Sequence, residues 1–176
     1  MRLAITDACI FIDLIELQLT SEFFKLSIEI HTSLDVFNEL YDEQKELLKA
    51  YSSVGKLTIH NITSEDKGLI QKEPFPKSLS DSDKTVIYLA NKLNAILLSS
   101  DKAVRKYAKS IAVEYHGMLW IFDNLIEHKL ISPGLAIQKI EMLFSNNIVY
   151  QNNEELGNEK NKRLAFWQKQ SENKKP

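Results

Sequence analysis

Carboxylate side chains stand at several points where this chain passes from one predicted element to the next. Asp7 directly follows the apolar run of residues 2–6, and Asp101 comes two residues after the apolar run of residues 95–99. Asp81 and Asp83 lie at the start of the predicted helix over residues 81–93, and Glu39 lies about two turns into the predicted helix that follows the second strand. In open parallel sheets, ligands bind beyond the carboxyl ends of the strands. We therefore expect four or five of these carboxylates, although distant in sequence, to converge on one crevice.

A cluster of carboxylates needs a counter-charge, because negative charges a few Å apart raise each other's pKa. Hard divalent cations supply that charge and prefer oxygen ligands. Zinc is less suited, since the histidines at positions 31, 60, 116 and 128 lack metal-ligand spacing such as His-x-x-x-His. The pattern therefore predicts a Mg²⁺ or Mn²⁺ site. A metal-activated water beside a bound phosphate is the chemistry of phosphodiester hydrolysis.

Each of these carboxylates also has an ordinary structural interpretation. Asp7, Asp81, Asp83 and Asp101 stand where an N-cap or a first-turn acid stabilises a helix. Glu39 lies among other acids and fits the solvated face of a helix. No single position favours a functional site, but the joint placement at strand ends does.

The elements that must position these residues follow from the apolar pattern. Short strand-like runs cover residues 2–6, 26–31, 56–62, 95–99 and 111–115. Helical spacing covers residues 8–18, 32–51, 63–73, 81–93, 102–110, 117–129 and 133–144, and two prolines make residues 74–80 a loop. Strands that alternate with helices predict a three-layer α/β/α sandwich around a mainly parallel sheet of about five strands.

Length and composition indicate one globular domain with a short appendage. The 176 residues are 44% hydrophobic and 26% charged, which is typical of a globular protein. Residues 1–149 are expected to form this domain, and residues 150–176, rich in Asn, Gln, Glu and Lys, a C-terminal helical extension. The formal net charge of −2 excludes binding to nucleic acid by bulk charge alone.

The sequence also bears on the cellular location of the protein and on whether it holds a disulfide or a nucleotide-binding site. Cys9 is the single cysteine, which excludes an intramolecular disulfide and is compatible with a reducing cytoplasm. The N-terminus lacks a signal-peptide pattern, and no stretch approaches the roughly 20 apolar residues of a membrane span. We therefore expect a cytoplasmic protein. Its five glycines form no phosphate-binding loop, which argues against a dinucleotide or nucleoside triphosphate site.

Four segments arrive in an order that resembles the acidic signature of PIN-domain nucleases, which include VapC-type toxins. They are ITDACIFIDLI at residues 5–15, TSLDVFNEL at residues 32–40, LSDSDKTVIYLA at residues 79–90, and AILLSSD at residues 95–101. The segment GMLWIFDNLIEHKLIS at residues 117–132 is similar to the late helix of some uncharacterised bacterial PIN-like proteins. The resemblance spans about residues 2–145.

The resemblance implies a metal-dependent ribonuclease. Its catalytic residues, which would also hold one or two Mg²⁺ or Mn²⁺ ions, correspond to Asp7, Glu39, Asp83 and Asp101. The spacing to residues 87 and 90 favours Asp83 over Asp81 as the third acid. The resemblance also implies an RNA substrate, a toxin role with an antitoxin protein as partner, and a homodimer, for which the apolar residues of 156–167 are a candidate contact.

The sequence departs from the family pattern after its first aspartate. Ala8 and Cys9 stand where the family usually has Ser or Thr followed by Asn or Ser. The hydroxyl or amide that helps hold the metal-bound water is therefore missing. This departure leaves open a second hypothesis from a different class, a catalytically inactive PIN-like module for binding or assembly.

Basic and aromatic side chains supply candidate contacts to nucleic acid. Lys102, Arg105 and Lys106 share one side of the predicted helix after Asp101 and could hold a phosphate backbone. A solvated helix face is the ordinary alternative. Trp167 is a candidate for stacking on bases.

Overall fold

The computed structural model describes residues 2–172, in which the chain divides into two compact units. The first, here called the sheet unit, contains the residues up to Ile15 and the segment Ser27–Met118. The second, the helical unit, contains Glu16–Leu26 and the residues from Leu119 onward. The domain boundary expected between residues 149 and 150 stays a prediction, and residues 1 and 173–176 lie outside the described part.

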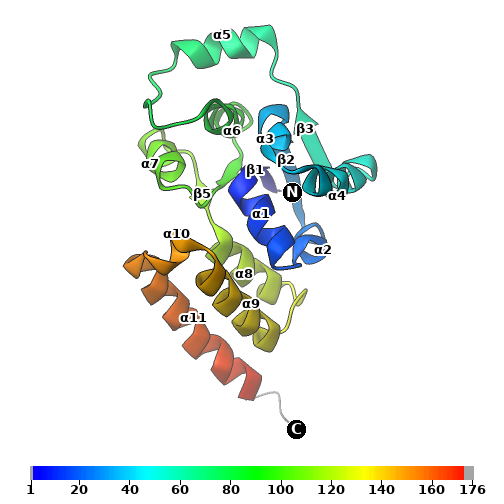
Figure 1. The fold of residues 1–176 in the computed structure, drawn as a ribbon, viewed down its shortest axis with the longest axis vertical. Coiled ribbons are helices and arrows are strands. Elements are labelled where there is room, and N and C mark those ends of the chain that lie inside the picture. The colour runs from blue at the N-terminus through cyan, green and yellow to red at the C-terminus, as the bar shows by residue number, and fades with distance from the viewer. Residues whose placement is uncertain (1, 173–176) are drawn as a thin grey trace. The chain divides into compact units, whose positions relative to one another are not determined.

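A central sheet of five parallel strands organises the sheet unit (Figure 1). The strands are β1 (Arg2–Thr6), β2 (Ile28–Ser33), β3 (Leu57–His60), β4 (Ile96–Leu98) and β5 (Tyr115–His116). Their order is β3-β2-β1-β4-β5. This confirms the predicted α/β/α sandwich with a parallel sheet. The chain moves outward from β1 in one direction to β3, then continues on the other side at β4, so β1 and β4 flank a topological switch point.

The two strands at the switch point are buried, as central strands of a parallel sheet must be. Ala4 and Ile5 in β1 and Leu97 and Leu98 in β4 are fully buried. The backbone N–H of Asp7 donates to the carbonyl of Leu98 at 3.0 Å. This bond continues the pairing one residue past β1 and fixes the backbone of Asp7 at the carboxyl edge of the sheet.

Side-chain caps define where several helices of the sheet unit begin. The hydroxyl of Ser33 accepts from the N–H of Val36, and the carboxylate of Asp101 accepts from Val104. Thr63 and Ser80 each begin a helix with a capping box, which satisfies backbone N–H groups that the helix leaves unpaired. The helices are α1 (Ala8–Glu16, whose last residue belongs to the helical unit), α3 (Leu34–Glu39), α4 (Asp42–Ser53), α5 (Ser64–Lys72), α6 (Asp81–Lys92) and α7 (Lys102–Ser110).

The single helix predicted over residues 32–51 is wrong, because two caps divide that segment. Strand β2 continues to Ser33, which then caps α3. Leu40 and Tyr41 are extended, with ψ of 154° and 157°, and separate α3 from α4. The side chain of Gln44 accepts a hydrogen bond from the N–H of Tyr41 at 3.0 Å, which stabilises the start of the second helix.

Two smaller differences occur further along the chain. The strand predicted at residues 111–115 is shorter and lies later, at Tyr115–His116, because Ile111 caps the end of α7 and Ala112 has a positive φ of 58°. The short helix α2 (Thr20–Phe23) was not predicted from the apolar pattern.

The helical unit contains α2, α8 (Met118–Glu127, whose first residue belongs to the sheet unit), α9 (Pro133–Asn146), α10 (Ile148–Gln151) and α11 (Glu154–Glu172). Ser132 caps α9 and Pro133 occupies its first turn, as predicted. The predicted C-terminal helix is present as α11. None of the described helices is long and apolar enough to cross a membrane.

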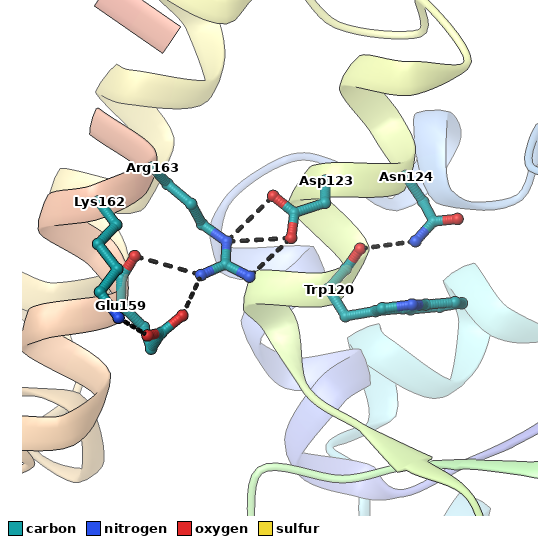
Figure 2. A network of polar contacts seen from close by, with 6 residues as sticks. All are labelled: Trp120, Asp123, Asn124, Glu159, Lys162 and Arg163. Carbon is teal, nitrogen blue, oxygen red and sulfur yellow. Dashed lines mark hydrogen bonds and ion pairs between the residues drawn. The ribbon is translucent and has the colours of Figure 1, made fainter. Parts of the chain in front are cut away.

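An arginine fork joins α11 to α8 within the helical unit (Figure 2). Arg163 donates from Nε to both carboxylate oxygens of Asp123 at 3.0 Å and from Nη2 to Oδ2 at 2.7 Å. Its Nη1 donates to the Glu159 carboxylate at 3.1 Å. Trp167 is 2% exposed and packs against Phe122. The suggestion that Trp167 stacks on bases is therefore wrong, because its ring is part of the core.

Candidate active site

Asp7 is a buried carboxylate held at the carboxyl end of β1. Its Oδ1 accepts from the N–H of Ala8 at 2.7 Å, and its Oδ2 accepts from the Cys9 thiol at 3.3 Å and the Ser99 hydroxyl at 2.8 Å. Burial raises the pKa of Asp7 to about 6, and the charge of Asp83 contributes to the rise, although these hydrogen bonds oppose it. The site therefore holds a desolvated carboxylate beside a second negative charge.

Ser99 connects Asp7 to Asp101 across the switch point. Its hydroxyl is fully buried, donates to Asp7, and accepts from the backbone N–H of Asp101 at 3.1 Å. The Asp101 side chain is exposed, and its Oδ1 accepts from the N–H of Val104 at 2.9 Å. Asp101 thus has the N-cap role that is its ordinary structural interpretation. Its backbone N–H also bonds to Ser99, the residue that donates to Asp7.

Asp83 lies in the first turn of α6 and completes its capping box. Its Oδ2 accepts from the N–H of Ser80 at 2.8 Å, and its own N–H donates to the Ser80 hydroxyl at 3.1 Å. Because the charge of Asp83 raises the pKa of Asp7, the two carboxylates lie within electrostatic reach of each other. The capping role and the functional role are therefore compatible.

Glu39, the last residue of α3, reaches α6 through a serine. Its Oε1 accepts a short hydrogen bond from the hydroxyl of Ser82, which is itself 2.9 Å from the hydroxyl of Ser80. Ser82 is buried and directly precedes Asp83. Sequence reasoning missed Ser82, since a serine in the first turn of a helix is common, and its position next to Asp83 was the available signal.

Asp81 takes no part in this arrangement. Its side chain is 98% exposed and pairs with Lys84 at 2.8 Å, and that lysine lowers the pKa of Asp81. Of the two candidates for the third acid, Asp83 is the one whose charge acts on Asp7.

The four predicted acids therefore form two pairs rather than one shell: Ser99 joins Asp7 to Asp101, and Ser82 with Ser80 joins Glu39 to Asp83. Among residues 2–172, no three His, Cys, Asp or Glu side chains lie close enough together to hold a metal ion. The atoms that Asp7 and Asp83 themselves offer to a cation are nevertheless carboxylate oxygens. No Lys, Arg or His in the described part of the chain forms a hydrogen bond to either carboxylate. This chemistry fits a hard divalent cation, which commonly binds few carboxylates and retains several waters.

Cys9 provides a polar group where the family pattern has a hydroxyl or amide. Its thiol donates to Asp7 and accepts from the N–H of Ser100 at 3.3 Å. Burial, together with the charge of Asp7, raises the pKa of Cys9 well above its usual value. The thiol is therefore protonated at neutral pH and is not a nucleophile.

The predicted basic contacts lie on α7, which Asp101 caps. Lys102 and Lys106 are exposed. Arg105 instead places its guanidinium over the ring of Tyr115, 5.2 Å from the centroid. The two lysines are thus the more accessible cations on this helix.

The comparison with protein families agrees with this fold. A family model described as DUF3368, a PIN domain, matches residues 3–156. No match was found among curated proteins. A solved structure, a domain of a functionally unknown protein from Methanocaldococcus jannaschii DSM 2661, is similar at 20% identity and a TM-score of 0.46. The alignment covers 66% of this chain and 91% of that one. Because the family model spans most of the sequence, the chain belongs to the PIN-domain family.

Proposed function

We propose that this protein is a Mg²⁺- or Mn²⁺-dependent ribonuclease that hydrolyses RNA phosphodiester bonds. The observation that carries the proposal is the buried Asp7 carboxylate, which lies at the switch point of a PIN domain, within reach of the Asp83 charge. A buried carboxylate that has a second negative charge nearby and no basic partner is costly to the fold, and a divalent cation would remove that cost.

Each candidate residue has a distinct task in this proposal. Asp7 and Asp83 would hold the metal ion, with Glu39 and Asp101 as further candidate ligands. When bound, the ion would supply a water of lowered pKa and a positive charge beside the phosphate. Ser82 and Ser99 orient the carboxylates that they contact, while Lys102 and Lys106 attract the phosphate backbone.

The test measures Mn²⁺ affinity and cleavage of a mixed RNA pool by the full chain. We expect Asp7→Asn, Asp83→Asn and Asp101→Asn to reduce cleavage by roughly 100-fold or more. Asp42→Asn is the matched control, because Asp42 is an exposed first-turn acid of α4. Asp81→Asn distinguishes the third acid, since it retains Mn²⁺ affinity if Asp83 is the ligand.

Two results would contradict the proposal. A wild-type chain that neither binds Mn²⁺ nor cleaves RNA excludes the nuclease function. Cleavage that survives both Asp7→Asn and Asp101→Asn shows that the residues are assigned incorrectly.

A binding module without catalysis is the second candidate. Ala8 and Cys9, together with the lack of a three-carboxylate cluster in the described residues, favour it. This candidate predicts association with RNA or protein that does not change when Mn²⁺ is removed.

The toxin role, with an antitoxin protein as partner and a cytoplasmic location, belongs to the same proposal. So does a homodimer, for which Phe166 on α11 is a candidate contact because it is 60% exposed. Light scattering on the purified chain, with and without Phe166→Ala, tests the dimer.

A further inference from the structure

A cavity of about 310 Å³ lies in the sheet unit and is lined by residues of α3, α5 and α6 and by Ile62, which precedes α5. Two of its lining residues are near candidate acids in the sequence: Asp35 is one helical turn before Glu39, and Asp81 is two residues before Asp83. Thr85, also in its wall, donates to the Ser33 hydroxyl at 2.7 Å, at the end of β2. Its volume is at the lower end of the range for ligand sites.

The walls of the cavity combine apolar surface with polar groups that have no partner. Ile62 is buried and Ile70 is half-buried, and together they give an aliphatic surface suited to a planar ring. The side chains of Asp35, Lys67 and Gln71 form no hydrogen bond or ion pair with other described residues. Asp35 is half-buried, whereas Lys67 and Gln71 are exposed. These three groups are therefore available to a ligand.

The charges of the lining do not favour a phosphate as the occupant. Asp35 and Asp81 line the cavity beside Lys67, and although Asp81 is paired with Lys84, Asp35 has no ion-pair partner among the described residues and would repel an anion. A neutral planar ligand with several N–H donors fits better, since a carboxylate only accepts hydrogen bonds. A nucleobase of a single-stranded RNA is such a ligand, and proteins read it along its Watson–Crick edge.

The donor and acceptor pattern distinguishes among the four bases. Guanine presents a ring N–H and an amino group side by side, which one carboxylate accepts together, and next to them a carbonyl oxygen. Cytosine and adenine present an amino group beside an acceptor nitrogen, and uracil presents one N–H between two carbonyls. Only guanine pairs both oxygens of Asp35 while it offers an acceptor to Lys67 or Gln71.

We propose that this cavity is a guanine subsite, in which Asp35 accepts from the ring N–H and the amino group. Lys67 or Gln71 donates to the carbonyl oxygen. This inference rests on the proposed function, because it supplies base selectivity to the RNA strand that reaches Asp7 and Asp83.

The experiment titrates each of the four nucleoside 5′-monophosphates into the ¹⁵N-labelled full chain in EDTA, with amide chemical shifts as the readout. We expect guanosine monophosphate to shift the side-chain amide of Gln71 and the backbone amides of Asp35 and Lys67. Asp35→Asn weakens this binding by about tenfold or more, because it removes a charged acceptor. Asp42→Asn, which changes another first-turn acid, leaves it unchanged.

Each alternative result overturns a defined part of the proposal. Shifts of equal size with the other bases exclude guanine selection. No shift at the cavity, in a chain that cleaves RNA with Mn²⁺, excludes the subsite but not the nuclease. Binding of guanosine monophosphate that depends on Asp35, in a chain that does not cleave, supports the subsite and refutes the proposed function. Wild-type thermal stability of Asp35→Asn excludes misfolding as the cause of lost binding.

Discussion

Two serines at the candidate site hold acids that the backbone alone does not position. Ser99 donates to Asp7 and accepts from the backbone of Asp101, and Ser82 donates to Glu39. A serine hydroxyl can donate once and accept twice, so each can orient a carboxylate while it bonds to a second group. At the scale of single residues, the geometry of the site depends on these hydroxyls as much as on the acids.

Replacement of Ser82 by alanine tests this dependence. Ser82→Ala removes the donor to Glu39, and we expect Mn²⁺ affinity to fall by about tenfold, as is typical when a partner of a metal ligand is lost. Ser82→Thr keeps the hydroxyl and restores most of the affinity, which a merely structural role does not explain. The matched control is Ser78→Ala in the exposed loop before α6. Equal affinities in the wild type and Ser82→Ala, measured by calorimetry, would contradict the assignment.

The places of Asp7 and Asp101 in the fold were predictable at the residue scale because the strand ends were predictable. Asp7 and Asp101 follow short apolar runs whose burial in a parallel sheet left few alternatives. Ser82 was not predictable, because its bond to Glu39 depends on how α3 packs against α6. Residues that are far apart in sequence acquire such contacts only through tertiary packing.

At the scale of elements, α5 is attached to α6 by one carboxylate. Asp66 accepts from the Tyr88 hydroxyl and the Lys92 ammonium at 2.7 Å each, and from the hydroxyl of Thr63 at 2.9 Å. The proposed guanine subsite lies along the same two helices. Its shape therefore depends on Asp66, which does not line the cavity.

This attachment weakens in acid. Lys92, Tyr88 and Thr63 hold the pKa of Asp66 well below its ordinary range. The stabilisation is therefore complete above the unfolded-state pKa of about 3.9 and is lost as the pH falls below it. We expect Asp66→Asn to lower Tm at pH 7 and the difference from wild type to narrow toward pH 3. Glu65→Gln, an exposed neighbour in the same turn, is the control. A Tm difference that is constant across this range would contradict the interpretation.

Strands β2 and β3 carry a second pH-dependent contact. Nδ1 of His31 lies 2.8 Å from Nε2 of His60, and one ring must accept for this bond to form. Burial lowers the pKa of both, the neighbouring His60 lowers that of His31 further, and Lys92 lowers that of His60. Only Glu29 acts in the opposite direction, on His31.

The neutral pair therefore stabilises the fold above the unfolded-state pKa of about 6.5, and its contribution is lost as the pH falls below that value. We expect the Tm of the wild type to fall between pH 7 and pH 5, and His60→Gln to reduce that slope. Exposed His128 provides the control, His128→Gln. An unchanged slope in His60→Gln would show that other groups cause the acid sensitivity.

The predicted helix over residues 32–51 shows where element-scale reasoning failed. Its apolar residues have helical spacing on both sides of Leu40, and that periodicity does not reveal a break. The break depends on Ser33 as an N-cap and on extended Leu40 and Tyr41. A polar residue such as serine can form an N-cap, but its presence in the sequence does not show that a helix begins there.

At the scale of the whole molecule, adjacent residues of α11 have opposite environments. Trp167 is 2% exposed, and Phe166 beside it is 60% exposed. We expect Trp167→Ala to lower the free energy of unfolding by about 3–5 kcal/mol, through lost burial and the cavity left behind. Phe166→Ala is expected to change it by about 0.5 kcal/mol or less. Urea unfolding followed by circular dichroism measures both, and similar losses in the two variants would contradict the packing described.

The net charge of −2 is a property of the whole molecule that the candidate site partly explains. Some of the acidic excess belongs to Asp7 and Asp83, where the proposed cation would reverse the sign of the local charge. Tight binding to RNA by bulk charge stays excluded. Binding of one RNA phosphate through a metal ion is compatible with the net charge of the chain.

The distance in sequence between contacting residues also affects how the protein folds during synthesis. The helical unit combines Glu16–Leu26 with residues from Leu119 onward. In the same way, the proposed site combines Asp7 with Asp101. A growing polypeptide therefore exposes its first aspartate long before the strand and serine that orient it have left the ribosome. If the protein is a ribonuclease, the nascent chain is inactive while most of its own message is being read. Such an activity would begin only once the fourth strand has paired with the first.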